Sequence, residues 1–253
     1  MTNKQVLKEK EQYITVYGVS LYTKLVGNKT LKPTIIMDAG YNDWSKTWDP
    51  IIEQLASEAQ VFMYDRAGLG KSEKTTRKRT SMEMVLELKE LLKEANLQPP
   101  YLLVGHSYGG INIRLFASLF PDAVSGLVLI DAPTENYRTV LLPRFPNEFQ
   151  KAYVKQFGSE RAYAEFQESF EQVKQQPYLG DIPLVILSAN QKQHYTPEIQ
   201  LLWHQLQEEL LQLSSKSKLL IAEESGHYIH HDEPELVIGA IRSLIGDENQ
   251  KSV

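Results

Sequence analysis

Cysteine is absent from the 253-residue chain, which excludes disulfides, thiolate metal ligands and a cysteine nucleophile. No run of about 18 apolar residues is present, so a transmembrane helix is not expected. Positive charge is in deficit, with 27 Lys and Arg against 32 Asp and Glu, so neither nucleic acid nor an anionic membrane is an expected partner. The first residues, MTNKQVLKEKEQYITV, carry charges where a secretory leader would need an apolar segment. We therefore expect a cytoplasmic protein whose partner is a small molecule, and association into a homo-oligomer is left open.

Short apolar runs alternate with segments of helical period along most of the chain. The six runs are 34–37, 61–64, 101–104, 126–130, 184–188 and 218–222. This alternation predicts a mostly parallel sheet covered by helices, the α/β class. Residues 13–27 are typical of an antiparallel pair at the sheet edge, with Gly18 near the turn. Residues 81–95 carry apolar side chains at helical spacing, with Ser81 as the expected N-cap.

The alternation stops once, between Asp131 and Asp181, where about 50 residues contain no convincing core strand. We interpret residues 132–182 as a helical lid inserted between two parts of a core domain, 1–131 and 183–253. The lid is rich in aromatic side chains, which either line an apolar pocket or pack the lid helices onto the core. They include Phe145, Phe149, Tyr153, Phe157, Tyr163, Phe166 and Phe170.

One serine follows an apolar run directly and is flanked by glycines, in the stretch YLLVGHSYGG. Gly105-His106-Ser107-Tyr108-Gly109 fits the pattern G-x-S-x-G, with a strand expected before it and a helix after it. A nucleophile on so sharp a turn needs neighbours without side chains, which Gly105 and Gly109 provide. The pattern predicts that Ser107 is a nucleophile exposed at a helix N-terminus, where developing negative charge is favoured. The His106 side chain should leave the turn in another direction, so we interpret it as packing.

With this motif the chain resembles the α/β-hydrolase superfamily over most of its length, and especially bacterial hydrolases that are classified only broadly. The other matching stretches are YDRAGLGKS, LVLIDA and SGHYIHHDEPELV. The resemblance implies an eight-stranded sheet flanked by helices, the nucleophile after strand 5, a lid after strand 6 and the base after the last strand. It implies no cofactor and no metal.

His227 is the best candidate among six histidines for the general base. It follows the strand-like KLLIA and precedes a helix expected after Pro234, at the same edge of the sheet as the serine. The cluster His227, His230, His231 and Asp232 could alternatively hold a metal, but the hydrolase pattern accounts for His227 without one.

The histidine also needs a carboxylate to hold its tautomer. In many members of the superfamily the acid follows strand 7, but here that position reads SANQKQHYTPE and its first carboxylate is Glu198. Asp131 ends the strand beside the nucleophile strand, and some hydrolases of this fold resemble this chain in placing the acid there. Because adjacent strands lie about 4.8 Å apart, we expect Asp131 to be the acid, with Glu198 as the alternative.

Two backbone amides are expected to bind the oxyanion, those of Tyr108, directly after the nucleophile, and Tyr41. Tyr41 follows Ala39-Gly40, where many relatives have His-Gly. The segment DRAGLGKS ends like a phosphate-binding loop, but Asp65 stands where the first glycine of that motif should be, so we interpret it as a turn after strand 4.

Together these residues predict a serine esterase that cleaves a carboxylic ester or related small acyl substrate through an acyl-enzyme on Ser107. The same residues could hydrolyse a lactone, a thioester, an amide or a carbon–carbon bond. A binding protein or receptor that keeps the triad but turns over little is a further alternative.

Overall fold

The computed structural model describes residues 7–176 and 178–246. Residues 1–6 and 247–253, at the ends of the expected core segments 1–131 and 183–253, lie outside this range, and so does residue 177 of the expected lid. The charged N-terminal stretch considered above begins with residues that are not described. No helix in the described part of the chain is long and apolar enough to cross a membrane.

Eight strands form one mixed sheet, in the order β1-β2-β4-β3-β5-β6-β7-β8. They are β1 (Glu9–Val16), β2 (Val19–Val26), β3 (Thr34–Asp38), β4 (Val61–Tyr64), β5 (Tyr101–His106), β6 (Val124–Ile130), β7 (Leu184–Ala189) and β8 (Ser217–Ala222). The β1–β2 and β2–β4 pairs are antiparallel, and every other pair in the sheet, from β4–β3 to β7–β8, is parallel. The predicted α/β-hydrolase fold class is confirmed.

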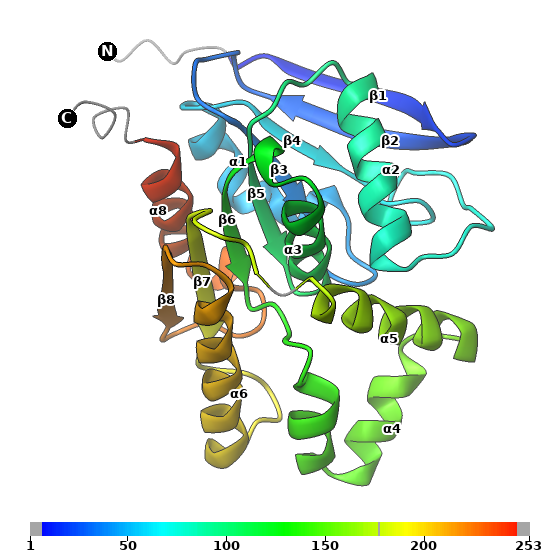
Figure 1. Cartoon of the computed structure of the whole chain (residues 1–253), viewed down its shortest axis with the longest axis vertical. Helices are drawn as coiled ribbons and strands as arrows, with labels where there is room; N and C mark the ends of the chain where they lie inside the picture. The colour runs from blue at the N-terminus through cyan, green and yellow to red at the C-terminus, as the bar shows by residue number, and fades with distance from the viewer. Residues whose placement is uncertain (1–6, 177, 247–253) are drawn as a thin grey trace.

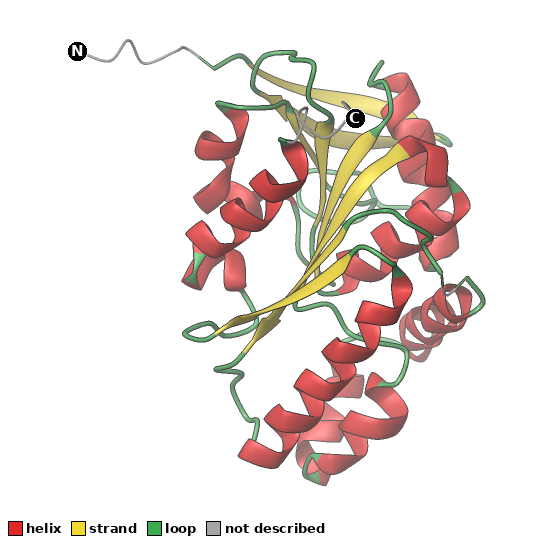
Figure 2. Cartoon of the chain, turned by 60° about the vertical axis from the view of Figure 1, so that its left-hand side comes forward, coloured by secondary structure: helices red, strands yellow, loops and turns green. Residues whose placement is uncertain are grey.

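Helices cover both faces of this sheet (Figures 1 and 2). They are α1 (Asp49–Ala56), α2 (Ser81–Glu94), α3 (Tyr108–Leu119), α4 (Asn147–Lys155), α5 (Glu160–Lys174), α6 (Pro197–Glu209), α7 (Ile229–Asp232) and α8 (Pro234–Ile245). Helices α2 and α3 pack together on one face, and α1 and α8 pack together on the other.

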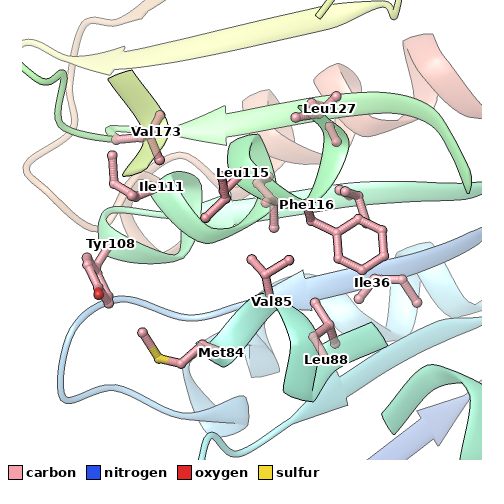
Figure 3. Close-up of a cluster of buried hydrophobic side chains, with 14 of the residues drawn as sticks. Ile36, Met84, Val85, Leu88, Tyr108, Ile111, Leu115, Phe116, Leu127 and Val173 are labelled. Atoms are coloured by element: carbon pink, nitrogen blue, oxygen red, sulfur yellow. The ribbon is translucent and has the colours of Figure 1, made fainter. Parts of the chain in front are cut away.

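The strands divide their side chains between two hydrophobic cores. Leu127 and Leu129 of β6 face the core under α2 and α3, whereas Val128 and Ile130 face the core under α1 and α8. This period of two follows from the pleat of a strand, and burial on both faces explains why the parallel strands are continuous apolar runs. Figure 3 shows the first core, in which Val85 and Leu88 of α2 lie close to Phe116 of α3.

Helix α2 begins one residue earlier than its expected cap implies. Its N-cap is Thr80, and Ser81 is its first helical residue, so the assignment of Ser81 as the cap was wrong. Side chains of α5 instead accept the first free N–H groups, with Ser169 Oγ 2.8 Å from the Ser81 nitrogen and Gln172 Oε1 2.8 Å from the Met82 nitrogen. The unsatisfied donors of a helix start therefore bind a second helix, which fixes α5 against α2.

The segment after β6 is helical and contains no strand in its described residues. Two short helical turns (Tyr137–Leu141 and Leu142–Arg144) precede α4 and α5. The Tyr137–Leu141 turn contacts α6, and α4 and α5 lie beyond the carboxyl ends of the central strands (Figure 1). Helix α5 buries one face against α2 and α3, while α4 has no buried residue.

Candidate active site

Ser107 lies on the turn between β5 and α3 and has a left-handed backbone, with φ 51° and ψ −121°. A Cβ on Gly105 would come within 2.7 Å of the Gly109 backbone, and one on Gly109 would overlap the Asp38 carbonyl oxygen. A side chain at either glycine would therefore clash with backbone that cannot move aside. The glycines allow this sharp turn to pack against the end of β3, and the Ser107 nitrogen is fixed by donating to Ile130 O at 2.9 Å.

Asp131 directly follows the last residue of β6 and is fully buried. It lies beside the serine turn because His106, which precedes Ser107, is paired with Ile130 in the sheet. Its Oδ1 accepts from the Ala189 N–H at 3.1 Å and the Trp203 Nε1–H at 3.0 Å. Its Oδ2 accepts from His227 Nδ1 at 2.6 Å. Since an ionised carboxylate can only accept, the Nδ1 of the imidazole carries a proton and the neutral ring has a free lone pair on Nε2.

His227 lies in the loop between β8 and α7, with its side chain 39% exposed. His106, the residue before the serine, contacts this loop directly, with its Nε2 2.9 Å from the His227 carbonyl oxygen. A carbonyl only accepts, so His106 must donate through Nε2. Burial and the neighbouring His227 hold the pKa of His106 well below its usual range, so the ring is neutral. His106 therefore does more than pack, the role expected from the sequence, because this hydrogen bond ties the nucleophile turn to the histidine loop.

Two further histidines, His230 and His231 of α7, contact Thr47, which lies in a short helical turn (Ser45–Trp48) before α1. His230 Nε2 lies 2.9 Å from Thr47 Oγ1, and His231 Nε2 lies 2.8 Å from the Thr47 carbonyl oxygen. No group of three or more His, Cys, Asp or Glu side chains in the described residues could hold a metal ion. The alternative of a metal site on His227, His230, His231 and Asp232 therefore gains no support from the geometry.

The loop that carries Tyr41 is held by a buried arginine. Arg66 donates to the Asp38 carboxylate and to the carbonyl oxygens of Ala39 and Gly40. The Gly40 carbonyl and the Tyr41 N–H belong to one planar trans peptide and therefore point in opposite directions. By holding the carbonyl, Arg66 directs the Tyr41 N–H away from itself. Among the described residues, neither the Tyr41 nor the Tyr108 amide has a protein acceptor.

A cavity of about 730 Å³ brings these residues together. Ser107, Asp131 and His227 line it, as do Tyr41 and Tyr108. Its wall is largely aromatic and comes from the segment after β6 and from α6 and the loop before it, through Tyr137, Phe149, Tyr153, Phe157, Phe166, Tyr195 and Trp203. Phe157 and Phe166 also pack into the main core, so these two aromatics both line the pocket and hold the helices to the core. Phe145, Tyr163 and Phe170 do not line the cavity.

Ser107 and His227 share the cavity without a direct hydrogen bond. In the described part of the chain, the His227 ring bonds to Asp131 through Nδ1, and no hydrogen bond joins its Nε2 to the Ser107 hydroxyl. Such bonds are often long in unliganded enzymes and shorten when substrate binds. Glu198, the alternative acid, lies exposed in the first turn of α6 and does not line the cavity. Of the two candidate carboxylates, only Asp131 contacts His227.

The α/β-hydrolase fold family matches residues 33–158 of the chain. The uncharacterised protein YqjL of Bacillus subtilis is 38% identical over 210 residues, which span 82% of this chain and 81% of that protein. The chain belongs to the α/β-hydrolase superfamily. Its fold also matches Cfl2 of Burkholderia cenocepacia (TM-score 0.72, 19% identity, covering 94% and 96% of the two chains). A similar match is to an epoxide hydrolase of Bacillus megaterium (TM-score 0.71, 17% identity, 93% and 100%). At these identities the two structures show the shared fold and no more.

One residue of this α/β-hydrolase's site was missed at the sequence level. Lys192, in the loop between β7 and α6, places Nζ 2.5 Å from Asp131 Oδ2. It lies in the position where the resemblance led us to look for an acid, and a lysine there gave no signal of its own. Burial opposes ionisation of Asp131, but the Lys192 ammonium and the hydrogen bond from His227 outweigh it, so the pKa of Asp131 is lowered.

Proposed function

We propose that this hydrolase cleaves a carboxylic ester or related small acyl compound through an acyl-enzyme on Ser107. The observation that carries the proposal is the 2.6 Å contact between His227 Nδ1 and Asp131 Oδ2 in the cavity that Ser107 lines. A histidine held in this tautomer can act as a base through Nε2, and a serine on a strand-to-helix turn is placed to use it.

In the proposed reaction, Ser107 Oγ attacks the substrate carbonyl carbon while His227 Nε2 takes the hydroxyl proton. Asp131 stabilises the imidazolium that forms, and the free amides of Tyr41 and Tyr108 bind the oxyanion. The carbon–oxygen bond to the leaving alcohol then breaks, and the alcohol receives the proton from Nε2. Water, deprotonated by the same histidine, attacks the acyl-enzyme and releases the carboxylic acid.

The cavity supports an uncharged substrate with an apolar part. Its aromatic wall provides apolar contact, and the nearby cation Lys192 is already bound to Asp131. A substrate carboxylate would find no unpaired lysine or arginine among the residues that line the cavity. We therefore expect neutral esters to be better substrates than their carboxylated analogues.

Epoxide hydrolysis, the activity of the Bacillus megaterium fold neighbour, is disfavoured by the nucleophile. A serine oxygen that opened an epoxide would form an ether with the substrate, and water does not readily cleave an ether. A serine that attacks a carbonyl forms an ester, which the same base and water can hydrolyse. The chemistry of Ser107 therefore favours acyl transfer.

A substrate panel tests the proposal. Neutral esters, lactones, thioesters, amides and a terminal epoxide are compared with the protein and its Ser107→Ala variant. We expect turnover of at least one acyl class, a loss of at least about 10⁴-fold in kcat in the variant, and no turnover of the epoxide. Equal activity of the two proteins, or turnover of the epoxide alone, would contradict the proposal.

A further inference from the structure

The Lys192 side chain is buried against the carboxylate of Asp131. It is only 8% exposed, and Nζ lies 2.5 Å from Asp131 Oδ2. The ammonium also lies over the Trp203 ring, 3.6 Å from the ring centroid, and 5.1 Å from that of Tyr195. Burial disfavours an ammonium and lowers the pKa of Lys192, while the Asp131 carboxylate opposes this shift and the aromatic faces also favour the cation.

Lys192 and His227 share one oxygen of Asp131. Oδ2 accepts from both, whereas Oδ1 accepts from the Ala189 amide and the Trp203 indole. Without Lys192, the carboxylate would keep three donors, so its hydrogen bonds do not require the lysine. What the lysine adds is a positive charge on Nζ, which donates to the same Asp131 oxygen, Oδ2, that binds the imidazole.

We propose that Lys192 is a positioning residue whose charge sets the pH range of the His227 base. This role of Lys192 rests on the proposed function, in which His227 takes the proton of Ser107. The ammonium offsets part of the negative charge of Asp131, so Asp131 stabilises the imidazolium less than an unpaired carboxylate would. His227 then stays neutral, and able to take the serine proton, at lower pH.

The other groups near His227 do not duplicate this charge. His106, at the end of β5, and His230, in α7, have their pKa values lowered by burial, to about 3 for His230, so both are neutral at ordinary pH. Tyr228 packs against the His227 ring, and its pKa is raised by burial. Also in α7, His231 binds Thr47 and Asp232 accepts the Gly226 N–H. The Asp232 carboxylate favours the imidazolium, opposes Lys192 and is unchanged in the variants below.

The test is the pH profile of kcat/KM for Lys192→Met and Lys192→Gln, which remove the charge. Without the ammonium, the imidazolium is more stable, so we expect the acid limb to move to higher pH by about one unit. Lys192→Arg, which keeps the charge, should leave the limb near that of the parent protein. Lys93→Met, which removes an exposed ammonium at the far end of α2, is the matched control and should leave it unchanged.

A purely structural lysine would give a different result. Its loss would lower kcat or thermal stability at every pH without moving the acid limb. Cooperative thermal unfolding shows that a neutral variant is folded. If the acid limb of a folded Lys192→Met or Lys192→Gln variant coincides with that of the parent protein, the proposal is overturned.

A second measurement keeps this outcome separate from failure of the proposed function. Imidazole titration by NMR, with the His227 signal assigned from its loss in His227→Gln, requires no turnover. The His227 midpoint should rise by about one pH unit in the neutral variants and stay unchanged in Lys93→Met. An unmoved midpoint overturns the role of Lys192, whereas absence of all hydrolysis contradicts only the proposed function.

Discussion

Asp131 and Ser107 both have left-handed backbones, with φ of 46° and 51°, at the ends of neighbouring strands. This conformation costs energy for a residue with a side chain, and it persists only where the surroundings enforce it. Hydrogen bonds from the Ser107 nitrogen to Ile130 O and from the Asp131 nitrogen to Leu187 O tie each turn to the next strand. Both turns therefore direct a polar side chain toward the cavity instead of continuing the strand.

Replacement of Asp131 by Asn tests its proposed role as the acid. An amide can donate to Nδ1, which would place the imidazole proton on Nε2 and remove its base function. We expect kcat to fall by about 10⁴-fold. The matched control is Glu198→Gln, which changes the exposed alternative carboxylate and should leave kcat near that of the parent protein. If Glu198→Gln were the inactive variant, the assignment of Asp131 would be wrong.

At the scale of elements, the site depends on how closely α3 approaches the end of β3. Gly109 allows the first turn of α3 to touch the Asp38 carbonyl, and Arg66 and Asn112 bind the Asp38 carboxylate from either side. This contact places the Tyr41 loop beside the nucleophile turn. The same helix is fixed to α5, because the Tyr108 hydroxyl lies 2.8 Å from Ser169 Oγ.

Gly109→Ala measures how strictly this approach is required. The added methyl group would overlap backbone that cannot move aside, and we expect the free energy of unfolding in urea to fall by about 3 kcal/mol. Gly239→Ala is the matched control, because Gly239 lies within α8 with no atom within 4 Å of the added Cβ. That change should stabilise the protein by up to about 1 kcal/mol through helix propensity. Equal effects of the two substitutions would contradict the close approach.

Element positions were largely predictable from sequence, whereas the contacts between elements were not. The apolar runs predicted β3 to β8 because buried parallel strands are continuously apolar, and the G-x-S-x-G pattern located the turn before α3. The cap of α2 was assigned wrongly because its N–H groups bind Ser169 and Gln172, about 90 residues away. Local pattern carries no information on such partners, and the contact of Lys192 with Asp131 escaped prediction for the same reason.

For the whole molecule, the buried histidines predict sensitivity to acid. Burial and the nearby His231 and His227 lower the pKa of His230 from 6.5 to about 3. Between these values the unfolded chain binds a proton that the folded protein does not, so stability falls as pH falls across the window. The slope is up to about 1.4 kcal/mol per pH unit from this residue.

Replacement of His230 by Gln should reduce this dependence. Gln does not titrate near these pH values, so we expect the free energy of unfolding to depend less on pH between about 6.5 and 4.5, by roughly one proton. Urea unfolding at several pH values measures the slope. His194→Gln changes an exposed histidine and is the control. An unchanged slope in His230→Gln would show that His230 is not held neutral.

The most direct test of the central claim is mass spectrometry after treatment with a fluorophosphonate. Intact mass followed by peptide mapping reports whether Ser107 is an activated nucleophile, with Ser107→Ala and His227→Gln treated alongside. We expect one adduct on Ser107, none in Ser107→Ala and much slower labelling in His227→Gln. Folded protein without an adduct, or an adduct on another residue, would contradict it and would favour a ligand-binding protein on the same fold.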